Sequence, residues 1–336
     1  MSDRTTREFV AKRTDLNNNI IAFDIRGLTP ERVDRNQYVP NAQAILERMI
    51  SEVKGERHKD TANFSDAVTF SFPTIKQHDI LITLNFWNAF ALYLDDFLDK
   101  KTHDQAHHVA LWKTYMINRV STGTDFMDIM YNVLSILLDN VFTPKLRQLH
   151  DQWYLDWLSL YDITEEVKVG KDIPTFEQYD NIRPLDIGFP PLQIYLYASL
   201  GFDPDDYPDI INNPNWELFH KWAGRHFYHS NDIYSSKKEI MQQQGKFTLI
   251  YIIMYNDNCD AQTASDKVVA MIHESWDMSV KYATLLAELN IPVLNEYTHA
   301  VMCILKGNVY WSSVTPRYQD MNKYKDYKLG DKLIFD

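Results

Sequence analysis

The first stretch that could do chemistry is a cluster of three carboxylates, Asp95, Asp96 and Asp99, at the end of an apolar run. Carboxylates that follow a buried segment should face a cleft, because an unpaired buried charge is costly to desolvate. We expect Asp95 to bind a metal ion directly, and Asp96 and Asp99 to support it as hydrogen-bonding or ion-pair partners. The alternative interpretation is a charged, solvated helix end.

The second stretch places Asn231, Ser235 and Glu239 at positions i, i+4 and i+8, so three oxygen-bearing side chains share one helical face. Hard cations such as Mg²⁺ prefer oxygen ligands and usually keep water or phosphate in their remaining positions. Lys238 is placed to contact the same phosphate, unless it is a solvated lysine in a surface turn. The two stretches together predict a diphosphate held between two metal-bearing helices.

Apolar spacing predicts the helices that must position these motifs. The first motif ends a helix expected over 78–99, whose apolar residues surround the axis and indicate a central, buried helix. The second motif lies in a helix expected over 215–240. Further helices are expected from residue 40 onward and near 107–120, 125–139, 144–167, 191–200, 246–256, 261–289 and 291–307.

Prolines and a glycine predict a helix break over 180–191, and residues 1–39 are polar enough to predict a poorly ordered or docking arm. No strand-like alternation of useful length and no internal repeat occur. We therefore predict one all-α catalytic domain over 40–336, a helical bundle around a central active-site cavity, with the metal motifs on two facing helices.

The bulk composition excludes several functions. The chain has 336 residues and a net charge of −12, which argues against nucleic-acid binding because phosphate neutralisation needs a basic face. Its two cysteines make no disulfide framework and predict a reducing, cytoplasmic setting. The charged N-terminus does not resemble a signal peptide, and the lack of any long apolar run predicts no membrane span.

With these two motifs the chain resembles class I terpene synthases of the single-domain, microbial kind. That family carries a DDxxD/E motif on one helix and an (N/D)DxxSxxxE motif on a facing helix. Here they match the stretches from Asp95 to Asp99 and from Asn231 to Glu239. The resemblance implies a class I terpenoid synthase-like bundle, with three Mg²⁺ ions expected around a bound diphosphate.

Two further elements resemble the same family. Its members end with an arginine–tyrosine pair that hydrogen-bonds the diphosphate, which Arg317 and Tyr318 match. The resemblance also makes Arg183 a diphosphate-sensing residue. Pro184 follows it directly and restrains its backbone, so an arginine that pairs with a surface carboxylate stays open as an alternative.

The segment after Arg183 completes this resemblance. It would make Asp186 the linker between the sensor and the site, and a backbone carbonyl at Ile187 or Gly188 the effector. Aromatic and apolar residues near the motifs are expected to form the cavity wall; the candidates are Phe90, Ala91, Leu92, Phe189, Tyr228 and Trp311.

The implied activity is that of a Mg²⁺-dependent lyase, a terpene synthase that ionises an acyclic prenyl diphosphate. It would release diphosphate and form a terpene hydrocarbon or alcohol through carbocations. Farnesyl diphosphate is the expected substrate, giving a sesquiterpene, with geranyl and geranylgeranyl diphosphate as further options. A chain-elongating prenyl diphosphate synthase and a non-catalytic helical scaffold are the alternatives. The oligomeric state stays open, with a homodimer as one option.

Overall fold

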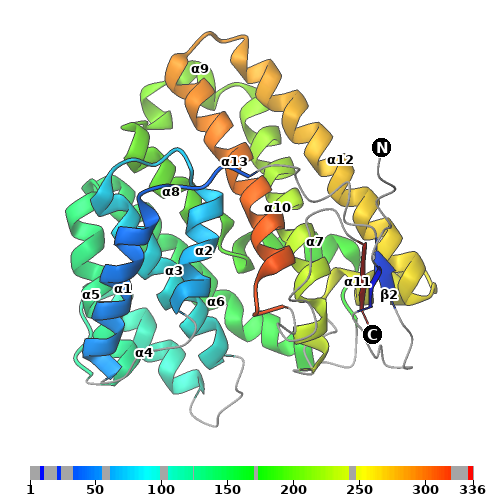
Figure 1. Ribbon diagram of the computed structural model, residues 1–336, viewed down its shortest axis with the longest axis horizontal. Coiled ribbons are helices and arrows are strands. Elements are labelled where there is room, and N and C mark those ends of the chain that lie inside the picture. Colours follow the sequence, from blue (N-terminus) through cyan, green and yellow to red (C-terminus); the bar gives the residue numbers. More distant parts are fainter. Residues whose placement is uncertain are drawn as a thin grey trace.

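The computed structural model describes most of the chain, in the ranges 8–10, 21–23, 33–54, 61–98, 105–123, 125–169, 173–241, 247–318 and 332–335. In these ranges the protein is a bundle of helices (Figure 1). The helices of its first half are α1 (Val39–Lys54), α2 (Thr61–Ser71), α3 (His78–Leu98), α4 (Gln105–Asn118), α5 (Phe126–Val141) and α6 (Pro144–Val169). Those of the second half are α7 (Phe176–Asp186), α8 (Phe189–Leu200), η1 (Pro204–Asp206), α9 (Pro208–Ile211), α10 (Pro214–Met241), α11 (Leu249–Asn256), α12 (Ala261–Ala287) and α13 (Pro292–Val314).

Helix α3 is central, as its sequence predicts. Leu81, Leu84 and Phe86 are fully buried, although they point to different sides of the helix axis. Their burial is possible because α3 contacts α1, α2, α5 and α8 at once. The first metal motif therefore starts from a helix that neighbours hold on several sides.

Helix α10, which carries the second motif, is the other long central element. It packs against α12 and also against α13, and Figure 1 shows these three helices side by side. Helix α13 in turn packs closely on α2. At this contact a Cβ atom on Gly307 would lie 2.4 Å from the carbonyl oxygen of Phe70, so only glycine permits the approach.

Two helices differ from the sequence prediction. Helix α2 was not expected, because residues on several of its sides are buried and its apolar spacing gives little amphipathic signal. Helix α7 occupies part of the segment predicted as a break. It starts at a capping box in which Thr175 and Gln178 bond each other's backbone, and it carries Pro184 in its last turn. The break itself is short, at Ile187 and Gly188.

Three short strands add a small sheet within the described residues, which the sequence did not predict. Its order is β1 (Glu8–Val10), β3 (Lys332–Phe335) and β2 (Ile21–Phe23). Strand β3 runs parallel to β1 and antiparallel to β2, and β2 contacts α12. The all-α prediction is confirmed for the helical domain.

The end of the N-terminal region lies against the helical domain. Asn36 donates hydrogen bonds from Nδ2 to the carbonyl oxygens of Phe72 and Ile75, at 2.6 and 2.7 Å. This side chain satisfies carbonyl groups that follow α2. The segment therefore holds the turn between α2 and α3 in place.

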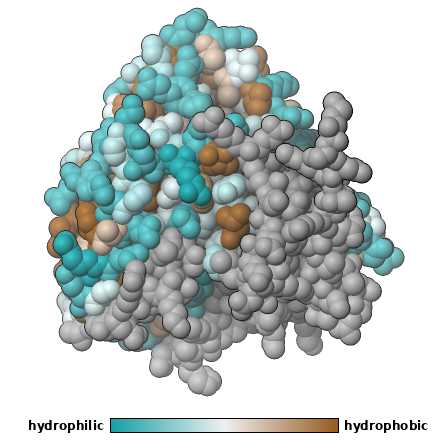
Figure 2. All heavy atoms as spheres, in the orientation of Figure 1, coloured by the Kyte–Doolittle hydropathy of each residue, from teal (hydrophilic) through white to brown (hydrophobic). Residues whose placement is uncertain are grey.

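Figure 2 shows a largely hydrophilic surface on the described part of the visible face, with scattered hydrophobic side chains. Among the described helices, none combines the length and the apolar character that crossing a membrane requires.

Candidate active site

A cavity of about 210 Å³ lies between the helices and takes residues from α2, α3, α6, α7, α8, α10 and α13. Most of its wall is apolar or aromatic. One part is polar and contains Asp95, Arg183, Asp186, Asn231, Ser235, Arg317 and Tyr318. Helices far apart in the sequence thus bring most of the predicted site residues to a single space.

The two metal motifs meet in this cavity. Asp95 comes from the last turn of α3, and Asn231 and Ser235 come from α10; all three line the cavity. Their carboxylate, amide and hydroxyl oxygens are the donors that Mg²⁺ prefers. Asp99 lies outside the described residues. Lys238 and Glu239 continue α10 toward its end, but their side chains also lie outside what the structure describes.

Arg317 bridges the aspartates of the first motif. Its Nη2 donates to Asp95 Oδ2 at 3.0 Å and to Asp96 Oδ1 at 2.9 Å, while Nη1 donates to Asp96 Oδ2 at 3.1 Å. Burial disfavours the guanidinium charge, but Tyr318, Asp95 and Asp96 outweigh it and raise the pKa of Arg317 above its ordinary value. The arginine therefore stays charged beside the carboxylates of Asp95 and Asp96.

Arg183 is the second cation at the polar part of the cavity. Its Nε and Nη2 donate to Asp232 Oδ1 at 3.0 and 2.6 Å, and Nη2 also donates to Asn231 Oδ1 at 3.1 Å. Nη1 donates to Asp186, the predicted linker. The side chain of its partner Asp232 is only 1% exposed, so the alternative of an arginine that pairs with a surface carboxylate is wrong.

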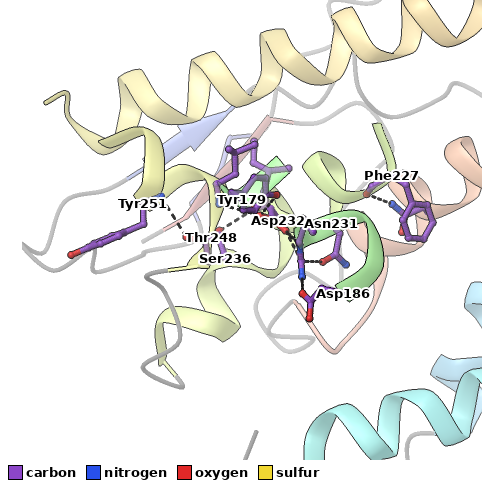
Figure 3. A network of polar contacts seen from close by, with 12 residues as sticks. Tyr179, Asp186, Phe227, Asn231, Asp232, Ser236, Thr248 and Tyr251 are labelled. Carbon is purple, nitrogen blue, oxygen red and sulfur yellow. Dashed lines mark hydrogen bonds and ion pairs between the residues drawn. The ribbon is translucent and has the colours of Figure 1, made fainter. Parts of the chain in front are cut away.

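Asp232 is a site residue that the sequence analysis did not single out. It is fully buried, and its Oδ2 accepts hydrogen bonds from Tyr179 Oη at 2.6 Å and from the backbone N–H of Leu249 at 3.0 Å. Burial raises the pKa of Asp232, whereas Arg183 and Tyr179 oppose that rise. Its carboxylate joins α7, α10 and the start of α11 (Figure 3).

A sequence signal for Asp232 existed. Neighbouring helical residues point about 100° apart, so when Asn231 faces the cavity, Asp232 must face the helices packed beside α10. A buried aspartate at such a position needs a cationic partner. Asn231 itself contacts Tyr318 through its Nδ2, at 3.1 Å from Tyr318 Oη, which ties the second motif to the C-terminal pair.

The helix break carries the predicted effector positions. Ile187 and Gly188 line the cavity between α7 and α8, next to Asp186. Gly188 has φ 79°, in the left-handed region that favours glycine. A Cβ atom there would lie 3.7 Å from the Trp153 ring, an ordinary contact, so the backbone conformation and not space requires the glycine.

Three of the six predicted wall residues line the cavity, and three do not. Ala91, Leu92 and Trp311 belong to the lining. The other three need correction, because they are absent from the lining and their side chains are engaged with other side chains. Phe90 packs on Tyr131 and Tyr154, Phe189 packs on Phe227 with the two rings tilted, and Tyr228 donates its hydroxyl to Asp180.

Much of the aromatic wall comes from residues that the sequence analysis did not single out. Helix α6 contributes Trp153, Tyr154 and Trp157, and α3 contributes Trp87. Trp153 and Trp157 stack with ring centroids 5.9 Å apart. Their i, i+4 spacing indicates a shared helical face, but the sequence offers no sign that this face borders a cavity.

A family model described as "Terpene synthase family 2, C-terminal metal binding" matches residues 86–278. This range holds both metal motifs and the Arg183 segment, and the chain belongs to the terpene synthase family. It is 26% identical over 204 residues to (E)-2-epi-beta-caryophyllene synthase of Selaginella moellendorffii, covering 59% of this chain and 53% of that protein.

Terpene synthase 4 of Dictyostelium purpureum is 25% identical over 186 residues, which cover 53% of this chain and 49% of that protein. The chain thus spans about half the length of the curated relatives that it matches.

Solved structures share the fold. The 2-methylisoborneol synthase from Streptomyces coelicolor A3(2), in complex with Mg²⁺ and 2-fluoroneryl diphosphate, superimposes with a TM-score of 0.74 at 18% identity, covering 86% of this chain and 96% of that one. Linalool/nerolidol synthase from Streptomyces clavuligerus gives 0.72 at 12% identity, over 84% and 98%. At this identity the likeness establishes a class I terpene synthase fold.

Proposed function

We propose that this chain is a Mg²⁺-dependent terpene synthase that ionises an acyclic prenyl diphosphate, with farnesyl diphosphate as its substrate. The observation that carries the proposal is the shared cavity. Oxygen ligands from α3 and α10 and cationic groups from α7 and the C-terminal pair surround one part of a space that is otherwise apolar. This arrangement fits a substrate with a charged head and a hydrocarbon tail.

The donor set fits Mg²⁺. Asp95, Asn231 and Ser235 offer three oxygen ligands, and diphosphate oxygens and water would complete the coordination. No group of three His, Cys, Asp or Glu side chains suited to a metal occurs in the described residues, so that part of the chain does not support a zinc-type site. Glu239 is proposed as a further ligand, and three ions with diphosphate bound.

In the proposed reaction the allylic carbon–oxygen bond breaks and its electron pair leaves with diphosphate, so a carbocation remains. Bound Mg²⁺ would supply Lewis-acid stabilisation of the charge on the leaving group. Arg183, Lys238, Arg317 and Tyr318 would donate hydrogen bonds to the same oxygens. Each such donor contributes about 3 kcal/mol at comparable oxyanion sites.

The rest of the cavity suits the cation that remains. Its apolar wall excludes water that would otherwise trap the cation early. The faces of Trp87, Trp153, Trp157 and Trp311 are available to the positive charge, and each cation–π contact contributes about 0.5–2 kcal/mol. The contact from Arg183 to Asp186, beside Ile187 and Gly188, would link diphosphate binding to the break between α7 and α8.

Complexes of proteins with the same fold support the substrate class. The structures include the complex described above and linalool/nerolidol synthase with 2-fluorogeranyl diphosphate. A metal and a prenyl diphosphate analogue therefore fit this fold in the neighbours, and we extend that ligand class to this chain.

The proposal is tested by offering geranyl, farnesyl and geranylgeranyl diphosphate separately with Mg²⁺. Diphosphate release is measured, and volatile products are identified by gas chromatography. We expect release with farnesyl diphosphate that stops when EDTA removes the metal. No release from any of the three would overturn the proposal and favour a non-catalytic scaffold.

A second incubation addresses the chain-elongating alternative. Dimethylallyl diphosphate is offered together with isopentenyl diphosphate, and the organic products are examined for longer diphosphates. We expect none. Longer diphosphates would instead assign the chain to prenyl elongation.

A further inference from the structure

Two asparagine side chains interrupt the hydrocarbon part of the cavity wall. Asn88 projects from α3 and Asn308 from α13, and both line the cavity. An amide in an apolar space costs free energy unless its polar atoms are hydrogen-bonded. The presence of two such amides therefore needs a physical reason.

Each amide is bonded at its nitrogen. Asn88 Nδ2 donates to the carbonyl oxygen of Phe64 at 2.8 Å, and Asn308 Nδ2 donates to the carbonyl oxygen of Phe227 at 3.1 Å (Figure 3 shows the contact at Phe227). A backbone carbonyl only accepts hydrogen bonds, so it fixes which end of each amide is the NH₂ group. The orientation of both carbonyl oxygens is thereby set.

The carbonyl oxygens of the two amides remain available as acceptors. No residue within the described ranges donates a hydrogen bond to Oδ1 of Asn88 or Asn308. Neither oxygen is among the buried side-chain atoms without a hydrogen-bond partner, so neither is fully enclosed by protein. Each therefore ends a fixed dipole with its negative pole on the side of the cavity.

Asn85 provides the internal comparison. It lies one turn before Asn88 on α3, and its Nδ2 donates to the carbonyl oxygen of Leu81 at 2.8 Å. Its own carbonyl oxygen is enclosed without a partner, and Asn85 is absent from the cavity lining. Asn88 and Asn308 therefore resemble Asn85 in that each amide nitrogen bonds to a backbone carbonyl oxygen. They differ from Asn85 because they line the cavity.

The two oxygens lie at different depths. Phe227, which holds Asn308, precedes Asn231 by one helical turn, about 6 Å along α10. Asn88 precedes Asp95 by two turns, about 10 Å along α3, on the same helical face. Asn308 is thus nearer the part of the cavity where the diphosphate would leave, and Asn88 lies deeper along the hydrocarbon tail.

We infer that Asn88 and Asn308 are specificity-determining residues whose carbonyl oxygens stabilise the positive charge of the carbocation at two successive positions. The inference rests on the proposed function. A dipole that is already oriented stabilises developing charge without reorganising, so it lowers the barrier to the cation that places charge beside it. Asn308 acts on the charge formed first, and Asn88 on the charge after it has moved along the chain.

The test compares Asn88→Leu and Asn308→Leu with Asn85→Leu as the matched control, using the full chain, farnesyl diphosphate and Mg²⁺. Leucine has a similar shape and removes the carbonyl dipole. Diphosphate release reports ionisation, and gas chromatography reports the ratio of products. Helical content by circular dichroism confirms folding. If a leucine variant loses helical content, the alanine variant at the same position, Asn88→Ala or Asn308→Ala, is used in its place.

We expect Asn308→Leu to slow diphosphate release about tenfold, less than the loss of a donor to a full oxyanion charge. Asn88→Leu is expected to slow release less than Asn308→Leu and to change the ratio of products by more than twofold. The Asn85→Leu control should keep the wild-type rate and ratio.

Asn88→Leu and Asn308→Leu could instead release diphosphate at the wild-type rate and give the same product ratio as Asn85→Leu. That result would overturn this inference and leave the proposed function standing. An equal change in all three variants would also overturn it, because a general packing effect would then explain the result. If the unaltered chain releases no diphosphate from any of the three prenyl substrates, the proposed function itself fails.

Discussion

Arg183 donates two hydrogen bonds to a single oxygen of Asp232: its Nε and Nη2 atoms both bond to Asp232 Oδ1, at 3.0 and 2.6 Å. The arginine fork is thereby turned so that its remaining hydrogen bonds reach Asn231 and Asp186. A buried carboxylate behind the cavity wall thus sets the direction of a cation in the wall. The same carboxylate binds Tyr179, so it connects α7 with α10 at two residues.

Replacing Asp232 with alanine should therefore lower stability strongly. Removing one partner of a buried ion pair leaves the other charge uncompensated, and the free energy of unfolding should fall by about 3–5 kcal/mol. Urea unfolding followed by circular dichroism measures the change. Asp206→Ala, an exposed aspartate in η1, serves as the control and should change stability by less than about 0.5 kcal/mol. Similar values for the two variants would contradict the assigned role.

The metal-binding hypothesis predicts a different pattern. Asp95→Asn, or Asn231→Ala combined with Ser235→Ala, should abolish diphosphate release while helical content stays unchanged, because these side chains line the cavity and do not build the core. Asp79→Asn, in the exposed first turn of the same helix as Asp95, should release diphosphate at the wild-type rate. Near-wild-type release by either motif variant would remove the metal site from the account.

Gly188 and Gly201 form a matched pair for testing the helix break. Both have positive φ, 79° and 59°, and a Cβ atom would meet no close neighbour at either position. Alanine should therefore cost about 1–2 kcal/mol of stability at both sites through backbone strain. Only Gly188 lines the cavity, so only Gly188→Ala should also slow diphosphate release. Slower release by both variants would attribute the effect to general destabilisation.

Buried histidine makes the stability of this protein depend on pH. Burial, aided by the nearby Arg147 charge, lowers the pKa of His150 from 6.5 to about 3. The folded state then binds fewer protons than the unfolded state between these values. The contribution of His150 is fully present above pH 6.5 and declines by about 1.4 kcal/mol per pH unit as pH falls toward 3.

His150→Phe should remove this dependence, because neither ring nitrogen of His150 has a hydrogen-bond partner in the described residues. Between pH 7 and pH 5 the free energy of unfolding should fall by about 2 kcal/mol less in the variant than in the wild type. Urea titrations at both pH values provide the comparison. His107→Phe, at an exposed position, should leave the wild-type difference unchanged, and a similar slope in all three proteins would refute the prediction.

The positions of most helices and the metal motifs could be predicted from the sequence, because both depend on local spacing. An i, i+4, i+8 set of oxygen side chains stays on one face wherever its helix packs, as Asn231 and Ser235 do. Likewise, apolar residues all around 78–98 require neighbours on all sides, whichever helices these are.

Residues that depend on which helices meet could not be predicted in this way. Phe90 and Ala91 are adjacent, yet only Ala91 lines the cavity, because its neighbour points toward Tyr131 and Tyr154. Asp232 gains its role from Tyr179 and Arg183 on another helix. Helix α2 lacks a clear periodicity because α1, α3 and α13 cover it from several sides.

The sequence by itself determined the chemical types of the ligands, their spacing along two helices and the all-helical character of the domain, since helical periodicity follows from the backbone alone. The tertiary structure decided that Asp95, Asn231 and Arg317 face one cavity, that Arg183 is held by Asp232, and that the amide nitrogens of Asn88 and Asn308 bond to the backbone carbonyl groups of Phe64 and Phe227. These relationships join residues far apart in the chain, so only the packing of the helices fixes them.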